Sequence, residues 1–184
     1  MDIKQRNTIK YSIMKKTYII AEIGINHNGC LKTAKKLIDI AAAAGCDAVK
    51  FQKRNPDVCV PEHQKGVMRD TPWGKMAYLD YKYKVEFGQD EYDEIDRYCK
   101  QQNIAWSASP WDLDSLKFLE QYDIPFIKIP SAMITNKNLI SAAGETGKKI
   151  IISTGMSTLE EIDEAVNELE VYCEYKDIAI LHCN

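Results

Sequence analysis

The stretch KIIISTGMSTLEEIDEAVNEL, residues 149–169, decides the fold because it joins a buried strand to a helix through a short turn. Its first five residues are rich in β-branched side chains, which is typical of a buried parallel strand. Ser157 and Glu160 are three positions apart, and this capping-box pattern predicts that a helix begins there. The helix itself is predicted from apolar residues three and four positions apart, at Leu159, Ile162, Ala165, Val166 and Leu169.

The same strand-and-helix unit recurs along the chain. Strands are predicted at residues 18–22, 48–52, 104–109, 126–129, 149–153 and 178–183. Helical patterns lie between them, and Gly45 supplies a left-handed cap after the first helix. This strict alternation predicts right-handed βαβ units and a parallel sheet.

The expected fold class is α/β, and the expected architecture is a (β/α)₈ TIM barrel that is truncated after about six strands. A closed barrel typically needs about 250 residues, whereas this chain has 184. An open doubly wound sheet would also hold six strands, but the Gly-rich phosphate turn that usually follows its first strand is absent. We therefore assign residues 18–184 to an incomplete barrel domain that follows a polar extension, residues 1–17.

The composition excludes several classes of protein. With 45% hydrophobic and 28% charged residues, the chain is typical of a globular domain rather than a disordered one. The net charge of −3 comes from charges spread along the chain, so we expect small-molecule partners and neither nucleic acid nor a membrane. Six cysteines without a CxxC pair argue against a zinc site or a disulfide framework and favour the reducing cytoplasm. Segment 1–17 lacks the apolar core of a secretory signal.

The segment 53–87 interrupts the regular alternation, because it separates the second strand from its helix by over 30 residues. Loops of this length are usually functional or disordered. The aromatic residues Trp73, Tyr78, Tyr81 and Tyr83 make it too aromatic for a typical disordered linker. We therefore predict a loop that covers substrate, with a disordered linker as the alternative.

Polar residues stand near the C-terminal ends of the first five predicted strands, where the active-site mouth of a β/α barrel lies. They are Glu22, Lys50, Gln52, Ser107, Ser109, Lys128, Ser131, Ser153 and Thr154. Residues two apart project to the same face of a strand, so we expect Lys50 and Gln52 to lie together. For Gln52, Ser107 and Thr154, a strand-end polar residue that merely meets solvent is an equal alternative.

The two lysines carry the functional prediction. A lysine inside an apolar strand is costly to bury without an anionic partner, so Lys50 and Lys128 predict a site for a small phosphorylated or carboxylated anion. Glu22 could be their charge partner, or it could orient a substrate hydroxyl or water and move a proton. His27, after the first strand, could orient Glu22 or contact substrate, or it could only stabilise its loop. His63 is interpreted as solvated, and His182 as a packed core residue.

Five motifs follow one another along the chain: AEIGINHNG at 21–29, VKFQ at 49–52, IKIPS at 127–131, ISTGM at 152–156 and LHCN at 181–184. Together they resemble the N-acetylneuraminate (sialic acid) synthase family over about residues 18–184. The resemblance implies a (β/α)₈ barrel enzyme of sialic acid biosynthesis, a phosphoenolpyruvate-dependent transferase. Such an enzyme condenses phosphoenolpyruvate with N-acetylmannosamine or a related 2-acylamino sugar, giving a nine-carbon 2-keto sugar acid and phosphate.

The resemblance also implies roles for individual residues. It implies that phosphoenolpyruvate contacts Lys50, Lys128, Ser109, Ser131 and Ser153. It makes Glu22 and Gln52 sugar-side residues, and Glu22 is the candidate for positioning or deprotonating the attacking water. The implied cofactor is a divalent metal, Mn²⁺ or Mg²⁺, whose protein ligands are expected beyond Asn184. A homodimer is implied for the full-length form, while the 184-residue chain by itself is expected to be inactive.

One position departs from the family pattern, and two other functions stay open. Many family members carry a carboxylate two residues after the serine of the IKIPS motif, where this chain has Met133. The departure leaves the exact sugar undetermined. A Schiff-base aldolase is one alternative, because a lysine at a barrel strand end forms imines when its pKa is lowered. A non-catalytic truncated barrel or interaction module is the other.

Overall fold

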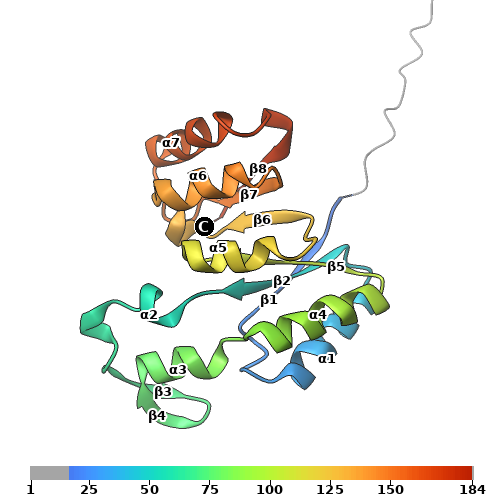
Figure 1. Ribbon diagram of the computed structural model, residues 1–184, viewed down its shortest axis with the longest axis vertical. Helices are drawn as coiled ribbons and strands as arrows, with labels where there is room; N and C mark the ends of the chain where they lie inside the picture. Colours follow the sequence, from blue (N-terminus) through green and yellow to red (C-terminus); the bar gives the residue numbers. More distant parts are fainter. Residues whose placement is uncertain (1–16, 184) are drawn as a thin grey trace, which may run out of the picture.

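The structure is a computed structural model that describes residues 17–183 (Figure 1). Parallel strands β1 (Ile20–Gly24), β2 (Ala48–Lys53) and β5 (Ala105–Pro110) pair in the order β1-β2-β5. Strands β6 (Phe126–Ile129), β7 (Lys149–Ser153) and β8 (Ile178–Leu181) pair in parallel in the order β6-β7-β8. These strands coincide with the six predicted runs to within two residues at each end. The extension predicted over residues 1–17 lies almost entirely outside the described residues.

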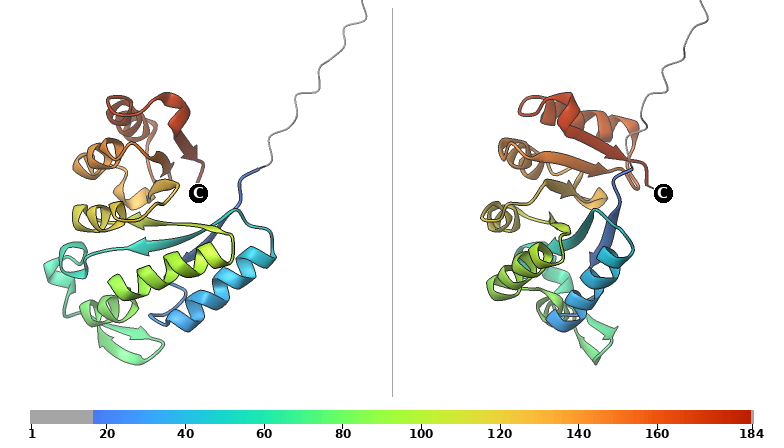
Figure 2. Two further views of the ribbon diagram at one scale, coloured as in Figure 1. Left: turned by 45° about the vertical axis from the view of Figure 1, so that its right-hand side comes forward. Right: turned by 90° about the vertical axis from the view of Figure 1, so that its right-hand side faces the viewer.

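Five helices alternate with these strands as predicted: α1 (Leu31–Ala43), α4 (Gln89–Gln101), α5 (Leu113–Glu120), α6 (Lys137–Glu145) and α7 (Leu159–Glu170). They all cover one side of the strands, so the opposite side is free of helices (Figure 2). The described residues thus form an open arc of β/α units of the TIM-barrel type. In such an arc, the strand face that carries no helices corresponds to the inside of a barrel.

The two three-stranded sheets meet along a seam between β5 and β6. These neighbouring strands lie against each other but form no common backbone ladder. Instead, the buried Ser107 hydroxyl of β5 donates a hydrogen bond of 2.6 Å to the carbonyl oxygen of Phe126 in β6. Ser107 is fully buried and has a structural role, so the predicted alternative in which it merely meets solvent is wrong.

The hydrophobic core lies between the strands and the helices. Strand residues of one parity, such as Val49, Phe51 and Ile127, are completely buried there. Residues of the other parity face the inner side, because successive side chains of a strand point in opposite directions. The strand side chains that pack against the helices therefore stabilise the fold, while polar side chains can occupy the inner face.

The turn before α7 differs from the prediction by one residue. The helix N-cap is Thr158, whose hydroxyl accepts a hydrogen bond of 3.2 Å from Glu161 N–H, while the Glu161 carboxylate accepts one of 2.8 Å from Thr158 N–H. The predicted Ser157–Glu160 capping box is therefore wrong. The Ser157 hydroxyl instead donates to the Gly155 carbonyl within the turn. Gly45, in contrast, follows α1 with a φ of +79°, as predicted.

Segment 53–87 has secondary structure of its own and extends away from the strands (Figure 1). It contains α2 (Pro56–Cys59), η1 (Glu62–Gln64), a β3 (Met68–Thr71)–β4 (Gly74–Ala77) hairpin and α3 (Tyr78–Val85). Its aromatic rings stack with cations, such as Arg69 at 4.0 Å from the centre of the Tyr78 ring. These elements are ordered, so the disordered-linker alternative is wrong, and covering of substrate stays a prediction.

Two further short helices, η2 (Ser131–Met133) and η3 (Tyr175–Asp177), precede α6 and β8. Within residues 17–183, no helix is both long and apolar enough to cross a membrane.

Candidate functional site

Three of the predicted residues meet on the inner face of the first sheet. Glu22 lies beside Lys50 in the pairing of β1 with β2, and Gln52 lies beside Ser109 in the pairing of β2 with β5. The Lys50 ammonium lies 2.7 Å from the Glu22 carboxylate and donates a hydrogen bond of 2.8 Å to the Ser109 hydroxyl. Burial lowers the pKa of Lys50, and the Glu22 charge opposes that effect. The structure therefore brings Glu22, Lys50 and Ser109 together.

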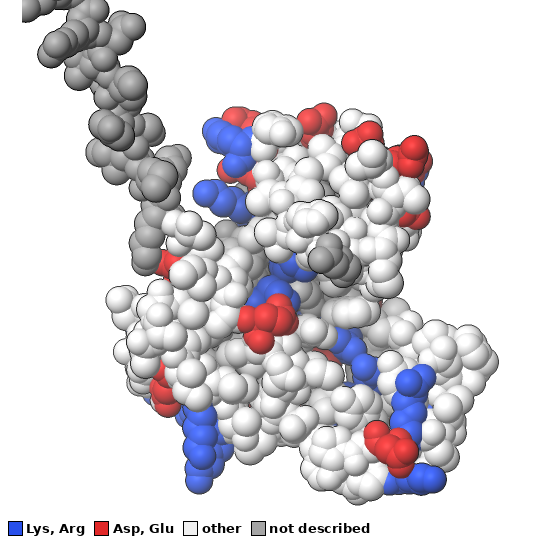
Figure 3. All heavy atoms as spheres, turned by 180° about the vertical axis from the view of Figure 1, so that it is seen from behind, with Lys and Arg blue, Asp and Glu red and all other residues white. Residues whose placement is uncertain are grey.

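Lys128 reaches the same face from the second sheet. It is buried, and its ammonium forms no hydrogen bond or ion pair with any residue in 17–183. Burial, and next the positive charge of Lys50, lower the pKa of Lys128 to about 8, while Glu22 opposes the shift. Basic and acidic side chains gather in the hollow that crosses this face of the molecule (Figure 3). Among residues 17–183, Lys50 is thus paired with a carboxylate, whereas Lys128 is not.

The hydroxyl groups of the second sheet stand next to this lysine. A methyl group on Gly155 would lie 3.4 Å from both Ser131 Oγ and Cys183 Cβ, so these two side chains border the same point. A hydrogen bond with Ser153 lowers the pKa of the Cys183 thiol, and the positive charge of Lys128 adds to that effect. Cys183 was missed as a site residue, although its place at the end of the sixth strand could have indicated it. Cys183 thus links Ser131 and Ser153, which border it, to Lys128, whose charge acts on its thiol.

The Thr154 hydroxyl is not available to donate a hydrogen bond to a ligand. Its hydroxyl donates a hydrogen bond of 2.9 Å to the carbonyl oxygen of Leu181 and so ties the ends of β7 and β8 together. The hydroxyl thus bonds to the backbone and Thr154 is buried, so the predicted alternative in which it merely meets solvent is wrong.

Gln52 projects towards Glu22 on the inner face. A side chain added at Gly24 would meet Glu22 Oε1 at 3.0 Å and Gln52 Nε2 at 3.2 Å, so both groups border this glycine. Gly24 follows a register shift in β1 and has a φ of +55°, a conformation that glycine adopts without strain. The side-chain amide oxygen of Gln52, Oε1, accepts a hydrogen bond from the Arg54 guanidinium. Sequence reasoning did not single out Arg54, because it follows the strand rather than lying within it.

The histidines contribute little to this site. His27 is buried, stacks on Phe87 with ring centres 3.9 Å apart, and accepts a hydrogen bond of 3.1 Å from Gly29 N–H. Burial lowers the pKa of His27 to about 4, so the ring is neutral near pH 7 and stabilises its loop. His63 is exposed, as interpreted from the sequence. His182 is exposed as well, so its interpretation as a core residue is wrong: it follows β8 and is not packed under a helix.

Met133 lies on the outer side of η2. It is partly buried, packs against the hydrophobic core, and lines a cavity of about 620 Å³ together with Trp111 and Asn136. Its thioether therefore fills space between η2 and the start of α5.

The described residues do not provide a metal centre. Within 17–183, no group of three or more histidine, cysteine, aspartate or glutamate side chains is arranged to hold a metal ion. Glu22, the carboxylate on the inner face, already pairs with Lys50. These residues thus do not fit a divalent metal by themselves, and the expectation that ligands lie beyond Asn184 stays a prediction.

The fold and the paired and unpaired lysines define the class: a TIM-barrel-type β/α protein with a candidate anion site at the C-terminal ends of its strands. The NeuB family model matches residues 37–184, and the chain belongs to the NeuB family.

Named relatives agree with this assignment. The chain is 37% identical over 177 residues to N-acetylneuraminate-9-phosphate synthase of Drosophila melanogaster, covering 95% of this chain and 47% of that protein. It is 40% identical over 173 residues to N,N'-diacetyllegionaminic acid synthase of Campylobacter jejuni, covering 92% and 52%. The chain therefore spans about half the length of the curated relatives it matches.

Solved structures give the same result. An N-acetylneuraminic acid (sialic acid) synthetase from Leptospira borgpetersenii, in complex with citrate, superposes with a TM-score of 0.78 at 31% identity, covering 90% of this chain and 53% of that one. A truncated 3-deoxy-D-arabino-heptulosonate 7-phosphate synthase from Thermotoga maritima, at 13% identity and a TM-score of 0.62, shares the fold alone.

Proposed function

We propose that the protein condenses phosphoenolpyruvate with N-acetylmannosamine or a related 2-acylamino sugar, giving a nine-carbon 2-keto sugar acid and phosphate. The observation that carries the proposal is the inner face, where Lys128 is buried without a partner among residues 17–183 and Lys50 is held by Glu22 and Ser109. A buried ammonium without a counter-ion is costly, and a bound anion would compensate for it. Membership of the NeuB family supports the choice of reaction.

In this proposal, the two lysines bind the negative charges of phosphoenolpyruvate. Ser109, Ser131 and Ser153 add directed hydroxyl donors, because a hydroxyl donates one hydrogen bond in a direction that its neighbours set. Phosphoenolpyruvate would thereby lie with its methylene carbon towards Glu22 and Gln52, the sugar-side residues. Lys128 supplies the larger share of new binding energy, since the Lys50 ammonium already has two partners.

The bond changes follow from the products. The methylene carbon of phosphoenolpyruvate forms a bond with the aldehyde carbon of the open-chain sugar, whose oxygen takes up a proton. Water adds to the carbon that carries the phosphate, and cleavage of the carbon–oxygen bond releases phosphate and leaves the 2-keto group. Glu22 would orient that water and accept its proton, while Gln52 would hold the sugar.

The finer parts of the proposal rest on the family resemblance. The whole protein, rather than this half-length chain, would carry out the reaction as a cytoplasmic homodimer with the barrel completed by further β/α units. A divalent metal, Mn²⁺ or Mg²⁺, would polarise the sugar aldehyde, with ligands outside the described residues.

The test measures phosphate released from phosphoenolpyruvate by the product of the complete gene, with N-acetylmannosamine and related sugars, with and without Mn²⁺. We expect release that requires both the sugar and the metal, that is lost in Lys128→Met, and that persists in Lys117→Met, a change of an exposed lysine on α5. Absence of release with every sugar, or release without a sugar, would contradict the proposal.

A Schiff-base aldolase is the second candidate, and the lowered pKa of Lys128, about 8, favours it. A larger fraction of such an amine is neutral and nucleophilic near pH 7 than of an ordinary lysine. Borohydride treatment in the presence of pyruvate distinguishes the two reactions. A covalent adduct on Lys128 would support the aldolase, whereas an unmodified chain supports the condensation.

A further inference from the structure

Arg54 is a buried cation to which the proposed reaction assigns no task. Its side chain is 6% exposed and lies just beyond β2, at the border between the inner face and segment 53–87. The guanidinium stacks 4.5 Å from the centre of the Trp111 ring, and its Nη2 donates a hydrogen bond to Gln52 Oε1. The hydrogen bond thus joins the Arg54 cation to Gln52, a candidate sugar-binding residue.

This contact determines which way the Gln52 amide points. A guanidinium only donates hydrogen bonds, so the amide must present its oxygen to Arg54. Its nitrogen consequently points to the opposite side, where Gln52 Nε2 and Glu22 Oε1 border the same point above Gly24. Without Arg54, the amide could rotate and present either end to the hollow.

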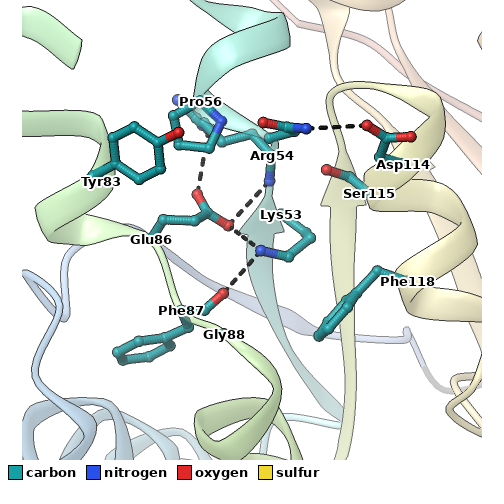
Figure 4. A pocket seen from close by; sticks show the side chains of 11 residues that line it. Lys53, Arg54, Pro56, Tyr83, Glu86, Phe87, Gly88, Asp114, Ser115 and Phe118 are labelled. Carbon is teal, nitrogen blue, oxygen red and sulfur yellow. Dashed lines mark hydrogen bonds and ion pairs between the residues drawn. The ribbon is translucent and has the colours of Figure 1, made fainter. Parts of the chain in front are cut away.

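Glu86, which follows α3, lies beside Lys53 and Arg54 (Figure 4). Its Oε1 accepts hydrogen bonds of 2.9 Å from Lys53 Nζ and 3.1 Å from Arg54 N–H. Glu86 Oε2 lies 3.9 Å from Arg54 Nε, and both of these atoms are buried without a hydrogen-bond partner. The carboxylate thus keeps the Arg54 side chain over Trp111 by charge, and its neighbours line a cavity of about 400 Å³.

We propose that Arg54 is a positioning residue that fixes the Gln52 amide with its nitrogen towards the hollow and so selects a sugar with an acceptor at that point. The carbonyl oxygen of an acylamino group is such an acceptor. The inference rests on the proposed function for the identity of the ligand, whereas the orientation of Gln52 is independent of it.

The first experiment measures ¹⁵N relaxation of the Gln52 side-chain amide, identified by its loss in Gln52→Leu. We expect a rigid amide in the unmodified chain and a mobile one in Arg54→Leu. In case that variant unfolds, Arg54→Lys keeps the charge beside Glu86 but not the planar stacking on Trp111, and should mobilise the amide as well. Arg69→Leu is the matched control, because Arg69 is exposed and bonds to Gln64 instead. An amide equally rigid in all variants would overturn the proposal.

The second experiment measures the affinities for N-acetylmannosamine and phosphoenolpyruvate separately, in the same variants. We expect Arg54→Lys to weaken sugar binding about fivefold and to leave phosphoenolpyruvate binding within about twofold, because one oriented hydrogen bond is worth about 1 kcal/mol. Equal weakening of both ligands would overturn a positioning role. If the product of the complete gene binds neither ligand, the proposed function is wrong, and the relaxation measurement still decides whether Arg54 orders Gln52.

Discussion

Lys50 on β2 and Lys128 on β6 occupy the same face of the arc but differ in their surroundings. Lys50 has a carboxylate at 2.7 Å and a hydroxyl at 2.8 Å, whereas Lys128 has no such partner within residues 17–183. Both are buried to a similar extent, at 5% and 8% exposed. The difference lies in charge compensation, because residues 17–183 supply an ion pair to Lys50 and none to Lys128.

This comparison separates stability from binding. Breaking a pair that the fold uses leaves a buried charge without compensation, which costs folding free energy. Removing a buried cation that has no partner should increase the free energy of unfolding and weaken only ligand binding. Substitutions in the Glu22–Lys50 pair should therefore reduce stability as well as ligand affinity, whereas substitution of Lys128 should reduce ligand affinity alone.

The largest expected effect is that of Lys128→Met on phosphoenolpyruvate binding. We expect affinity to fall about 100-fold, because a charge-assisted contact is worth about 1.5 to 3 kcal/mol. The same variant should gain about 1 to 3 kcal/mol in its free energy of unfolding at pH 7, since it buries no charge. Calorimetric titration and urea unfolding check both, with exposed Lys117→Met as the control. A less stable Lys128→Met would mean that the lysine is compensated within the chain.

Glu22→Gln should produce the opposite pattern in the first sheet. The Lys50 ammonium would lose its carboxylate, and we expect a loss of about 1 to 2 kcal/mol in the free energy of unfolding. The value is at the low end because the Glu22 side chain is 52% exposed and water screens its charge. Urea unfolding at pH 7 measures it beside Glu120→Gln, an exposed carboxylate at the end of α5. Unchanged stability would show that the pair contributes nothing.

The pH dependence distinguishes the two lysines further. Above pH 8, Lys128 loses the proton that gives it charge, so phosphoenolpyruvate affinity should fall by up to about tenfold per pH unit. The folded-state pKa, about 8, lies below the usual value of 10.5, so the unfolded chain binds more protons between these values. This group therefore makes stability rise with pH across that window. Unfolding curves from pH 7 to 10 should show the rise, and Lys128→Met should abolish it.

The smallest expected effect concerns the seam that joins the two regions. Ser107→Ala removes the buried hydrogen bond to the Phe126 carbonyl oxygen, so we expect a loss of about 1 kcal/mol. Ser157→Ala is the control, because its hydroxyl bonds only within a partly exposed turn. Thermal unfolding compares the two. Equal effects would mean that the seam is held by packing alone.

Much of this fold could be predicted from the sequence because its signals are local. Runs of β-branched residues such as Ile150 to Ile152 and the apolar spacing of α7 fix the order of strands and helices. The alternation within β2 likewise predicted that Lys50 and Gln52 share a face. The capping box was misplaced by one residue because Ser157 and Thr158 are adjacent equivalents, and only the turn geometry decides between them.

The rest depends on contacts between distant segments, which no local pattern contains. Nothing in the sequence near Arg54 indicates that Glu86 and Trp111 will enclose it. The different surroundings of Lys50 and Lys128 likewise follow from which strands become neighbours. The structural roles of Ser107 and Thr154 became clear only when their acceptors on other strands were known.

The central claim is that Lys128 is a buried cation without an ion-pair partner among residues 17–183 and that it binds an anionic ligand. An NMR titration of its ammonium group tests this claim most directly. The side-chain nitrogen of Lys128, identified by its loss in Lys128→Met, is followed against pH with and without phosphoenolpyruvate. The account predicts a midpoint near pH 8 in the free chain and a rise of at least about one unit when the ligand is bound. A midpoint near 10.5 that the ligand leaves unchanged would contradict it.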